Sequence, residues 1–300
     1  PGKPSCFDQH TIIKLKERDS NGKRMQVYIK DIVLGDRLAD GGVVTGIFKV
    51  QHNGQGMGVL DNVIVSRDHY VRYDNKWVHS CEHPDFMPLL DYNAEYLYCL
   101  NVSTKCIKIN KMVFSDWDDM TKTDEVYMYN KKYSELKDVV TTVSEVDMHE
   151  PINIHRFFDG GFSQNTKILT ADYGYKNISS LSVGDQLDLG NYVTGIVLID
   201  SRDLVQYDYV LKKENRNINT EKGVFNLPHE VIVRSTSNIV YNNVIGSERF
   251  DKVSTLEKCV ERRETSNPEE VMYHLLTSSG KLIIDDTVIY DYNSCLDHFI

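Results

Sequence analysis

The chain has 300 residues, of which 41% are hydrophobic, and a formal net charge of −10 at pH 7. This length can bury one large core or two modest ones. The acidic balance argues against a surface for nucleic acid or anionic membrane, because such surfaces need clustered Lys and Arg. No apolar run reaches membrane-spanning length and no signal-peptide core follows the N-terminus. We therefore expect a cytoplasmic protein without a nucleic-acid or membrane partner.

The six cysteines show no Cys-x-x-Cys spacing and are too sparse for a disulfide framework. In a reducing compartment they are expected to remain thiols. His79, Cys81 and His83 alternate, so an extended strand would place them on one face, where imidazole and thiolate suit zinc. Three ligands at period two are a weak signal, and an ordinary strand and turn is the preferred interpretation. We expect no metal and no cofactor.

Composition and patterning predict a mostly β protein, because Tyr, Ile and Val are plentiful, Pro is scarce, and short apolar runs alternate with polar residues. Asp74-Asn75 is predicted to form a hairpin corner. In chain order, the strands of the first part are expected at about 11–15, 25–32, 42–50, 59–66, 69–73, 76–80, 96–101, 105–109 and 112–115.

A change of pattern follows these strands. Apolar residues recur at steps of three and four among charged ones over 124–145, which predicts an amphipathic helix. We interpret residues 120–159 as a helical connector.

After the connector the first part of the sequence is repeated. Residues 161–168 match 6–13 at an offset of 155 (161 − 6), and 178–187 match 29–38 at an offset of 149 (178 − 29). Val231-Ile232-Val233 echoes Val63-Ile64-Val65. Residues 273–294 match 98–119 at an offset of 175 (273 − 98). Shared apolar alternation with loops of different length predicts two copies of one β module, at 6–119 and 160–300, after a short segment at 1–5.

The first copy carries an ordered set of motifs. A cysteine opens a strand at Cys6, Ile29-x-x-Ile32-x-x-Gly35-Asp36 follows, and Ser66-x-x-His69 ends a β-branched run. The copy closes with Leu97-Tyr98-Cys99-Leu100 and Phe114-Ser115-Asp116-Trp117. This set resembles the Hint (Hedgehog/intein) self-processing module, in a subgroup met in large DNA viruses and phages. The resemblance implies two tandem, horseshoe-like β modules.

The resemblance also implies chemistry at the Ser5–Cys6 bond. The Cys6 thiolate would attack the Ser5 carbonyl carbon and convert the amide to a thioester, with the chain itself as substrate. Ser66 would orient the scissile amide, and His69 would protonate the departing nitrogen. His83 lies in a His-Pro pair that this subgroup often has, so it is a further candidate near the active site. Asp116 could order His69 or a water, although a turn carboxylate is the favoured interpretation.

The sequence departs from the family in several places. The His-Asn ending of an intein is absent at 114–117, so splicing is not expected and only cleavage before Cys6 remains, active or vestigial. In the second copy Gly161 replaces the cysteine, no histidine occurs in 233–239, and Ser163 lies two residues from the nucleophile position. The second copy is therefore expected to be chemically silent.

The alternative is a non-catalytic β scaffold, a structural or accessory component of a virus particle with virion or assembly partners. A host cytoplasm or a virion would then be its location. The silent second copy and the lost ending favour this alternative. So do the five residues before Cys6, which would leave as a stub if Pro1 is the true N-terminus.

Overall fold

A computed structural model of the chain describes residues 5–118, 160–172, 174–212, 216–220, 223–227, 230–236, 259–284 and 287–294. The described residues form strands β1 to β23 with short helical turns, which confirms the mostly β prediction. The predicted helical connector at 120–159 lies outside them. The chain divides into two compact units. Of the described residues, the first unit holds 5–118 and Thr194–Asp200, and the second unit holds the others.

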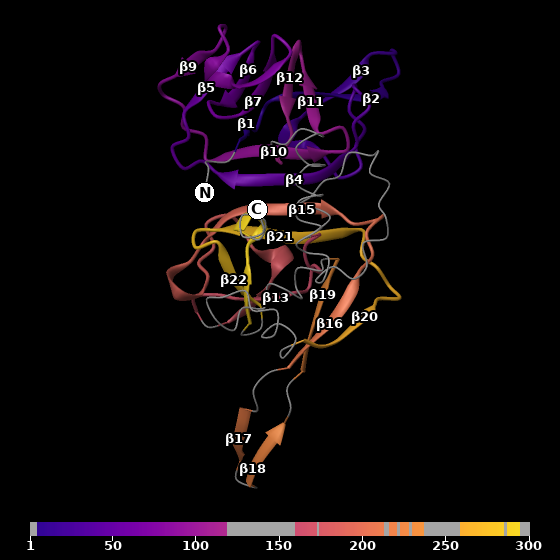
Figure 1. Ribbon diagram of the computed structural model, residues 1–300, viewed down its shortest axis with the longest axis vertical. Coiled ribbons are helices and arrows are strands. Elements are labelled where there is room, and N and C mark those ends of the chain that lie inside the picture. The colour runs from indigo at the N-terminus through magenta and orange to yellow at the C-terminus, as the bar shows by residue number, and fades with distance from the viewer. Residues whose placement is uncertain are drawn as a thin grey trace. The chain divides into compact units, whose positions relative to one another are not determined.

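The first unit is built around its first strand. In its main sheet, β1 lies between β10 and β6, in the order β4-β10-β1-β6-β5-β9 (Figure 1). A second sheet has the order β11-β12-β7-β8, and β2 pairs with β3. The strand bounds are β1 (Phe7–Asp8), β2 (Ile12–Arg18), β3 (Arg24–Tyr28), β4 (Val44–Gln51), β5 (Met57–Leu60), β6 (Val63–Ser66), β7 (Tyr70–Tyr73), β8 (Lys76–His79), β9 (Met87–Leu89), β10 (Tyr96–Val102), β11 (Cys106–Ile109) and β12 (Met112–Ser115).

Two tight turns decide how the strands of this unit pair. Asp74 and Asn75 have φ of 47° and 59° and join β7 to β8, which confirms the predicted hairpin corner. The prediction of one strand over 59–66 is wrong, because Asp61 and Asn62, with φ of 49° and 62°, divide it into the hairpin β5–β6. Two consecutive residues with positive φ match the twist of a two-residue hairpin, and Asp and Asn tolerate that conformation.

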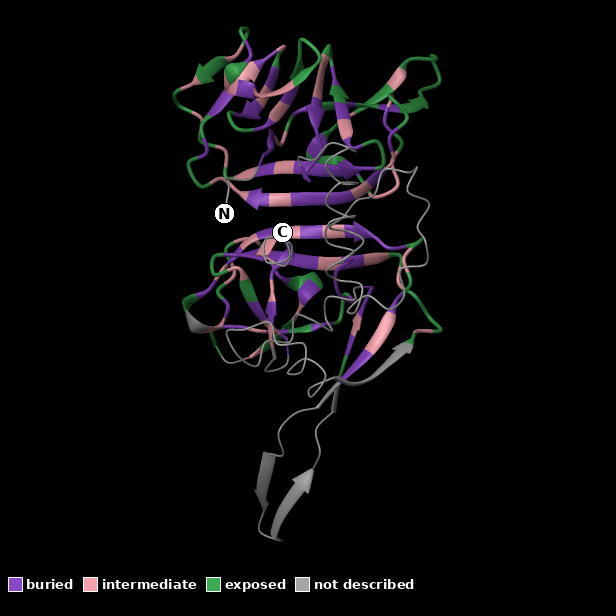
Figure 2. Cartoon of the chain, in the orientation of Figure 1, coloured by how far each residue is buried: buried purple, intermediate pink, exposed green. Residues whose placement is uncertain are grey.

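The core of the first unit lies against β1, β4 and β10. Along β4 and β10 most residues are buried, and both strands are largely purple in Figure 2. Phe7, Phe48 and Phe114 have no exposed surface. Their burial explains why the short strand β1 keeps a fixed place, since each buried aromatic side chain stabilises the fold by a few kcal/mol at roughly 25 cal/mol per Å².

The second unit has its own sheets, in the orders β14-β13-β22-β23 and β19-β16-β20, and a separate hairpin β17–β18. Its strands are β13 (Lys167–Leu169), β14 (Tyr175–Asn177), β16 (Tyr207–Lys212), β17 (Arg216–Thr220), β18 (Gly223–Leu227), β19 (Glu230–Ser235), β20 (Cys259–Glu264), β21 (Val271–Thr277), β22 (Lys281–Ile284) and β23 (Thr287–Tyr290). Strand β15 (Val193–Asp200) contributes Thr194–Asp200 to the first unit, where residues 195–199 pair with β4.

Matching contacts occur in the two units at the positions that the sequence repeat relates. Phe7 lies opposite Tyr98, and Phe162 lies opposite Tyr273. At the end of each repeat, a carboxylate accepts a backbone N–H fourteen residues earlier: Asp116 from Val102 at 3.2 Å, and Asp291 from Thr277 at 2.8 Å. Between the donor and the carboxylate, corresponding residues of the two units have positive φ, which is 61° at Lys105 and 71° at Gly280.

One part of the sequence match must be shifted. Phe7 lies opposite Val65, whereas its counterpart Phe162 bridges to Ser235. Residues 63–66 therefore correspond to 233–236, and the match of Val231-Ile232-Val233 with Val63-Ile64-Val65 is wrong by two residues. Alternating strands repeat every two residues, so the apolar pattern alone does not distinguish a shift of two.

Candidate functional site

The peptide bond between Ser5 and Cys6 lies at the head of β1, where Ser66 holds it from the neighbouring strand. Cys6 is fully buried and Ser5 is 7% exposed. The Cys6 N–H donates to Ser66 Oγ at 2.9 Å, and the Ser66 N–H donates to the Cys6 carbonyl oxygen at 2.9 Å. The Cys6 nitrogen is the atom that would leave in the proposed cleavage. The Ser66 hydroxyl therefore contacts the amide whose rupture the sequence predicts.

His69 is placed by a tight turn that follows β6. Its N–H donates to the Ser66 carbonyl at 3.1 Å, and the Ser80 N–H and hydroxyl donate to the His69 carbonyl at 2.7 and 2.9 Å. The spacing Ser-x-x-His thus keeps the serine on the strand and returns the histidine towards it. His69 has no exposed surface.

The imidazole of His69 has a defined orientation. Its Nε2 lies 3.0 Å from the Ser115 carbonyl oxygen, which can only accept, so Nε2 carries hydrogen and Nδ1 is the basic nitrogen of the neutral ring. The ring packs on Phe7 with centroids 4.5 Å apart and on Phe114 at 5.7 Å. The residue after Cys6 is therefore in direct contact with the imidazole.

The sequence patterns do not single out two polar residues, Asp8 on β1 and Tyr92, which contacts it. Side chains alternate along a strand, so Cys6 and Asp8 share the face opposite Phe7. The Tyr92 hydroxyl donates to Asp8 Oδ2 at 2.7 Å. Partial burial, then the Asp8 carboxylate and more weakly Cys6, raise the pKa of Tyr92, so its hydroxyl remains a donor at neutral pH. The period of two could have pointed to Asp8, but nothing local points to Tyr92.

Asp116 belongs to a buried ionic cluster, and its described contacts are with backbone and cation. Its carboxylate accepts the N–H groups of Val102 and Asp118, each at 3.2 Å, and lies 4.0 Å from Lys105 Nζ. Lys105 Nζ forms a closer pair with Asp118 at 2.6 Å. These contacts fit the turn-carboxylate interpretation, and the carbonyl of the neighbouring Ser115 contacts His69.

His83 lies in a turn of its own. Its Nδ1 accepts the Asp85 N–H at 3.2 Å, and its ring packs against Tyr73 with centroids 4.6 Å apart. The premise of an extended run from His79 to His83 is wrong, because a helical turn at Ser80–Glu82 follows β8. Within the described part of the chain, no group of three or more His, Cys, Asp or Glu is arranged to hold a metal.

In the second unit, the counterpart of the Ser5–Cys6 bond is Gly160–Gly161. Gly161 has φ of 80°, a backbone conformation that a cysteine rarely adopts. Thr236 stands at the position of Ser66, and a Cβ on Gly160 would overlap its Oγ1. The described geometry therefore leaves no room for a side chain before residue 161.

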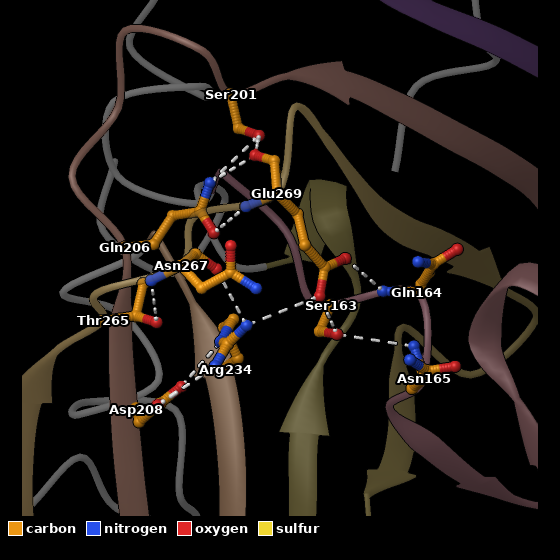
Figure 3. A network of polar contacts seen from close by, with 10 residues as sticks. All are labelled: Ser163, Gln164, Asn165, Ser201, Gln206, Asp208, Arg234, Thr265, Asn267 and Glu269. Atoms are coloured by element: carbon orange, nitrogen blue, oxygen red, sulfur yellow. Dashed lines mark hydrogen bonds and ion pairs between the residues drawn. The ribbon is translucent and has the colours of Figure 1, made fainter.

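The serine near this position is engaged in a polar network (Figure 3). The Ser163 hydroxyl donates to Glu269 Oε1 at 2.5 Å, and Arg234 Nε pairs with Asp208 at 2.7 Å. Hydrogen bonding to Asp208 raises the pKa of Arg234. Ser163 corresponds to Asp8 under the offset of 155. Asp8 bonds to Tyr92, which lies shortly before β10, and Ser163 bonds to Glu269, which lies shortly before the corresponding strand β21. Donor and acceptor are exchanged, since Asp8 accepts and Ser163 donates.

Each unit has a pocket beside this position, which is Asp8 in the first unit and Ser163 in the second. The two pockets are lined by corresponding residues. Their volumes are about 390 Å³ and about 310 Å³. The linings include Asp8, His10, Thr11, Ile12, Val63 and Ile64 in the first unit, and Ser163, Asn165, Thr166, Lys167, Val233 and Arg234 in the second. The lining residues near the first strand are related by the offset of 155. Val63 and Ile64 are related to Val233 and Arg234 by an offset of 170 (233 − 63), which is the shifted match described above.

No protein-family model matches the sequence, and no curated protein resembles it at a significant level. Among the described residues, no helix is both long enough and apolar enough to cross a bilayer. The grounds for assigning a function are therefore the motifs and the geometry around Cys6.

Proposed function

We propose that the first unit is a Hint-type self-processing module that cleaves its own chain once, between Ser5 and Cys6, by an N–S acyl shift without splicing. The observation that carries the proposal is the hydrogen bond from the Cys6 N–H to Ser66 Oγ at 2.9 Å. A hydroxyl on that nitrogen is what the motif Ser-x-x-His would be expected to provide. In this proposal the whole chain consists of two Hint-like modules, of which the second is silent.

In the proposed reaction, the Cys6 thiol loses its proton and the sulfur attacks the Ser5 carbonyl carbon. The C–N bond then breaks, the nitrogen takes up a proton, and a thioester joins Ser5 to the Cys6 sulfur. Water, or a small thiol, attacks the thioester and releases the segment that ends at Ser5. The new N-terminus is the Cys6 amine.

His69 is the group we assign to protonation of the leaving nitrogen. It is fully buried, packs on Phe7 next to Cys6, and is hydrogen-bonded through Nε2 to a carbonyl. Imidazole suits this step because it can take up and deliver a proton near neutral pH. Ser66 would keep the amide plane fixed while the proton is delivered.

A second candidate, a non-catalytic β scaffold such as a component of a virus particle, is supported by the second unit. There Gly160, Gly161 and Thr236 close the position of the scissile bond, while the surrounding strands and the terminal carboxylate contact are kept. A fold retained without its nucleophile has a use other than cleavage. In this case the first unit would resemble the second in function.

The two candidates are separated by fusing a folded protein before Pro1 and adding dithiothreitol. Self-processing predicts a fragment that begins at Cys6, which mass spectrometry detects. The Cys6→Ala variant should remain intact. The control variant Cys106→Ala, which removes a half-buried thiol elsewhere in the first unit, should cleave like the parent. A fusion that stays intact after long incubation contradicts self-processing and supports the scaffold.

A further inference from the structure

The pairing of β1 with β10 places a second thiol beside Cys6. Phe7 lies opposite Tyr98 and Asp8 opposite Leu97 in an antiparallel register. One step towards the N-terminus, the residue opposite Cys6 is Cys99. Residues directly opposite each other in a sheet project their side chains to the same face, so both sulfurs lie on one side.

The hydrogen bonds around Cys6 show which type of pair this is. Both its N–H and its carbonyl bond to Ser66 on β6. They therefore point away from β10, and Cys6 with Cys99 forms a non-hydrogen-bonded pair, the type whose Cα atoms are about 4.5 Å apart. A disulfide requires Cα atoms roughly 4.4–6.8 Å apart, so the backbone need not move far to allow the bond.

The state and surroundings of the two residues fit this pairing. Both are buried thiols without exposed surface. In the second unit both positions differ together, since Gly161 stands for Cys6 and His274 for Cys99. The unit that lacks the first thiol thus also lacks the second.

We propose that Cys6 and Cys99 form a reversible cross-strand disulfide when the protein meets a low-molecular-weight disulfide such as oxidised glutathione. Because neither sulfur is exposed, the reaction begins with a local opening that admits the oxidant. One thiolate then attacks a sulfur of the oxidant and releases one glutathione thiolate, giving a mixed disulfide. The other thiolate displaces the second glutathione. Overall the two cysteines lose two protons and two electrons, and the oxidant becomes two thiols.

The bond would have a consequence for cleavage, and this part rests on the proposed function. A sulfur in a disulfide is not a nucleophile, so oxidation would hold the Ser5–Cys6 bond intact and reduction would release it. The chain ahead of Cys6 would then be cleaved only under reducing conditions.

The test uses the full chain, incubated with oxidised glutathione until Cys81, which is partly exposed, has reacted. Digestion without reductant and mass spectrometry should then reveal a peptide that links Cys6 to Cys99. The matched variant Cys106→Ser should give the same link, and Cys99→Ser should give none. Cys6 and Cys99 recovered unlinked in the parent protein, or linked to other cysteines, would overturn the proposal.

The cleavage readout is kept separate. The oxidised fusion is treated with hydroxylamine, before and after reduction by a phosphine, which is not a thiol nucleophile. We expect cleavage only after reduction. A protein that forms the Cys6–Cys99 link but never cleaves supports the disulfide and contradicts self-processing, whereas one that cleaves but never links does the reverse.

Discussion

At the scale of single residues, the proposed cleavage depends on what contacts the Cys6 nitrogen. Ser66 Oγ accepts its N–H at 2.9 Å in a fully buried place. A buried donor that loses its acceptor costs about 1–3 kcal/mol, which corresponds to roughly a 5- to 150-fold change in an equilibrium or rate. The hydroxyl of Ser66 is thus the side-chain group whose removal should be felt most directly at the scissile amide.

We therefore predict that Ser66→Ala slows cleavage of the fusion about 5- to 150-fold. Ser66→Thr keeps the hydroxyl and should retain most of the rate. Initial rates of fragment release, followed by gel densitometry or mass spectrometry, measure the effect. Equal cleavage rates for Ser66→Ala and the parent would show that the hydroxyl has only a structural role.

At the scale of elements, the turn that connects β10 to β11 is stabilised by a buried ionic cluster. Lys105 is 6% exposed and pairs with Asp118 at 2.6 Å, with Asp116 at 4.0 Å. Removing one member of a buried pair leaves an uncompensated charge, which typically costs about 3–5 kcal/mol. Its carboxylates lie just after β12, where Asp116 directly follows Ser115, and the Ser115 carbonyl contacts His69.

Lys105→Met should therefore lower the free energy of unfolding by about 3–5 kcal/mol, because two carboxylates lose their cation. Lys108→Met, at an exposed position of the adjacent strand, is the matched control and should change it by less than about 0.5 kcal/mol. Urea titration followed by tryptophan fluorescence measures both. Similar stabilities for the two variants would contradict the importance of the cluster.

The elements also show how far sequence reasoning reaches. Turn chemistry predicts the corner at Asp74-Asn75. The same chemistry at Asp61-Asn62 is hard to recognise, because apolar residues on both sides resemble one continuous strand. Ser66 and His69 could be singled out because they lie three residues apart. Tyr92 and Cys99 could not, because their proximity to β1 comes from pairing between strands distant in sequence. The shift of two residues in the repeat cannot be seen in the sequence, because the apolar pattern of a strand repeats every two residues.

At the scale of the whole molecule, the two units keep corresponding strands, turns and pockets but differ at the head of the first strand. In the second unit, Gly161 has φ of 80° and Gly160 has no room for a Cβ. The difference is thus in the backbone as well as in the missing thiol. Matching contacts combined with these altered positions are what a unit kept for a structural role would show.

A cysteine placed in the second unit should consequently remain inert. We predict that Gly161→Cys produces no cleavage before residue 161, because the backbone there is unsuited to a side chain and no histidine occurs in 233–239. Intact-mass measurement after incubation with dithiothreitol checks this. A fragment beginning at residue 161 would show that the thiol alone is sufficient.

The central claim is that a thioester forms between Ser5 and Cys6, and the most direct measurement traps it. Hydroxylamine is added to the reduced fusion, and the mass of the released N-terminal fragment is determined. We predict a fragment ending at Ser5 as its hydroxamate, with none from Cys6→Ala. If the fusion remains uncleaved, or the fragment has another end, no acyl shift occurs at this bond and the self-processing function is wrong.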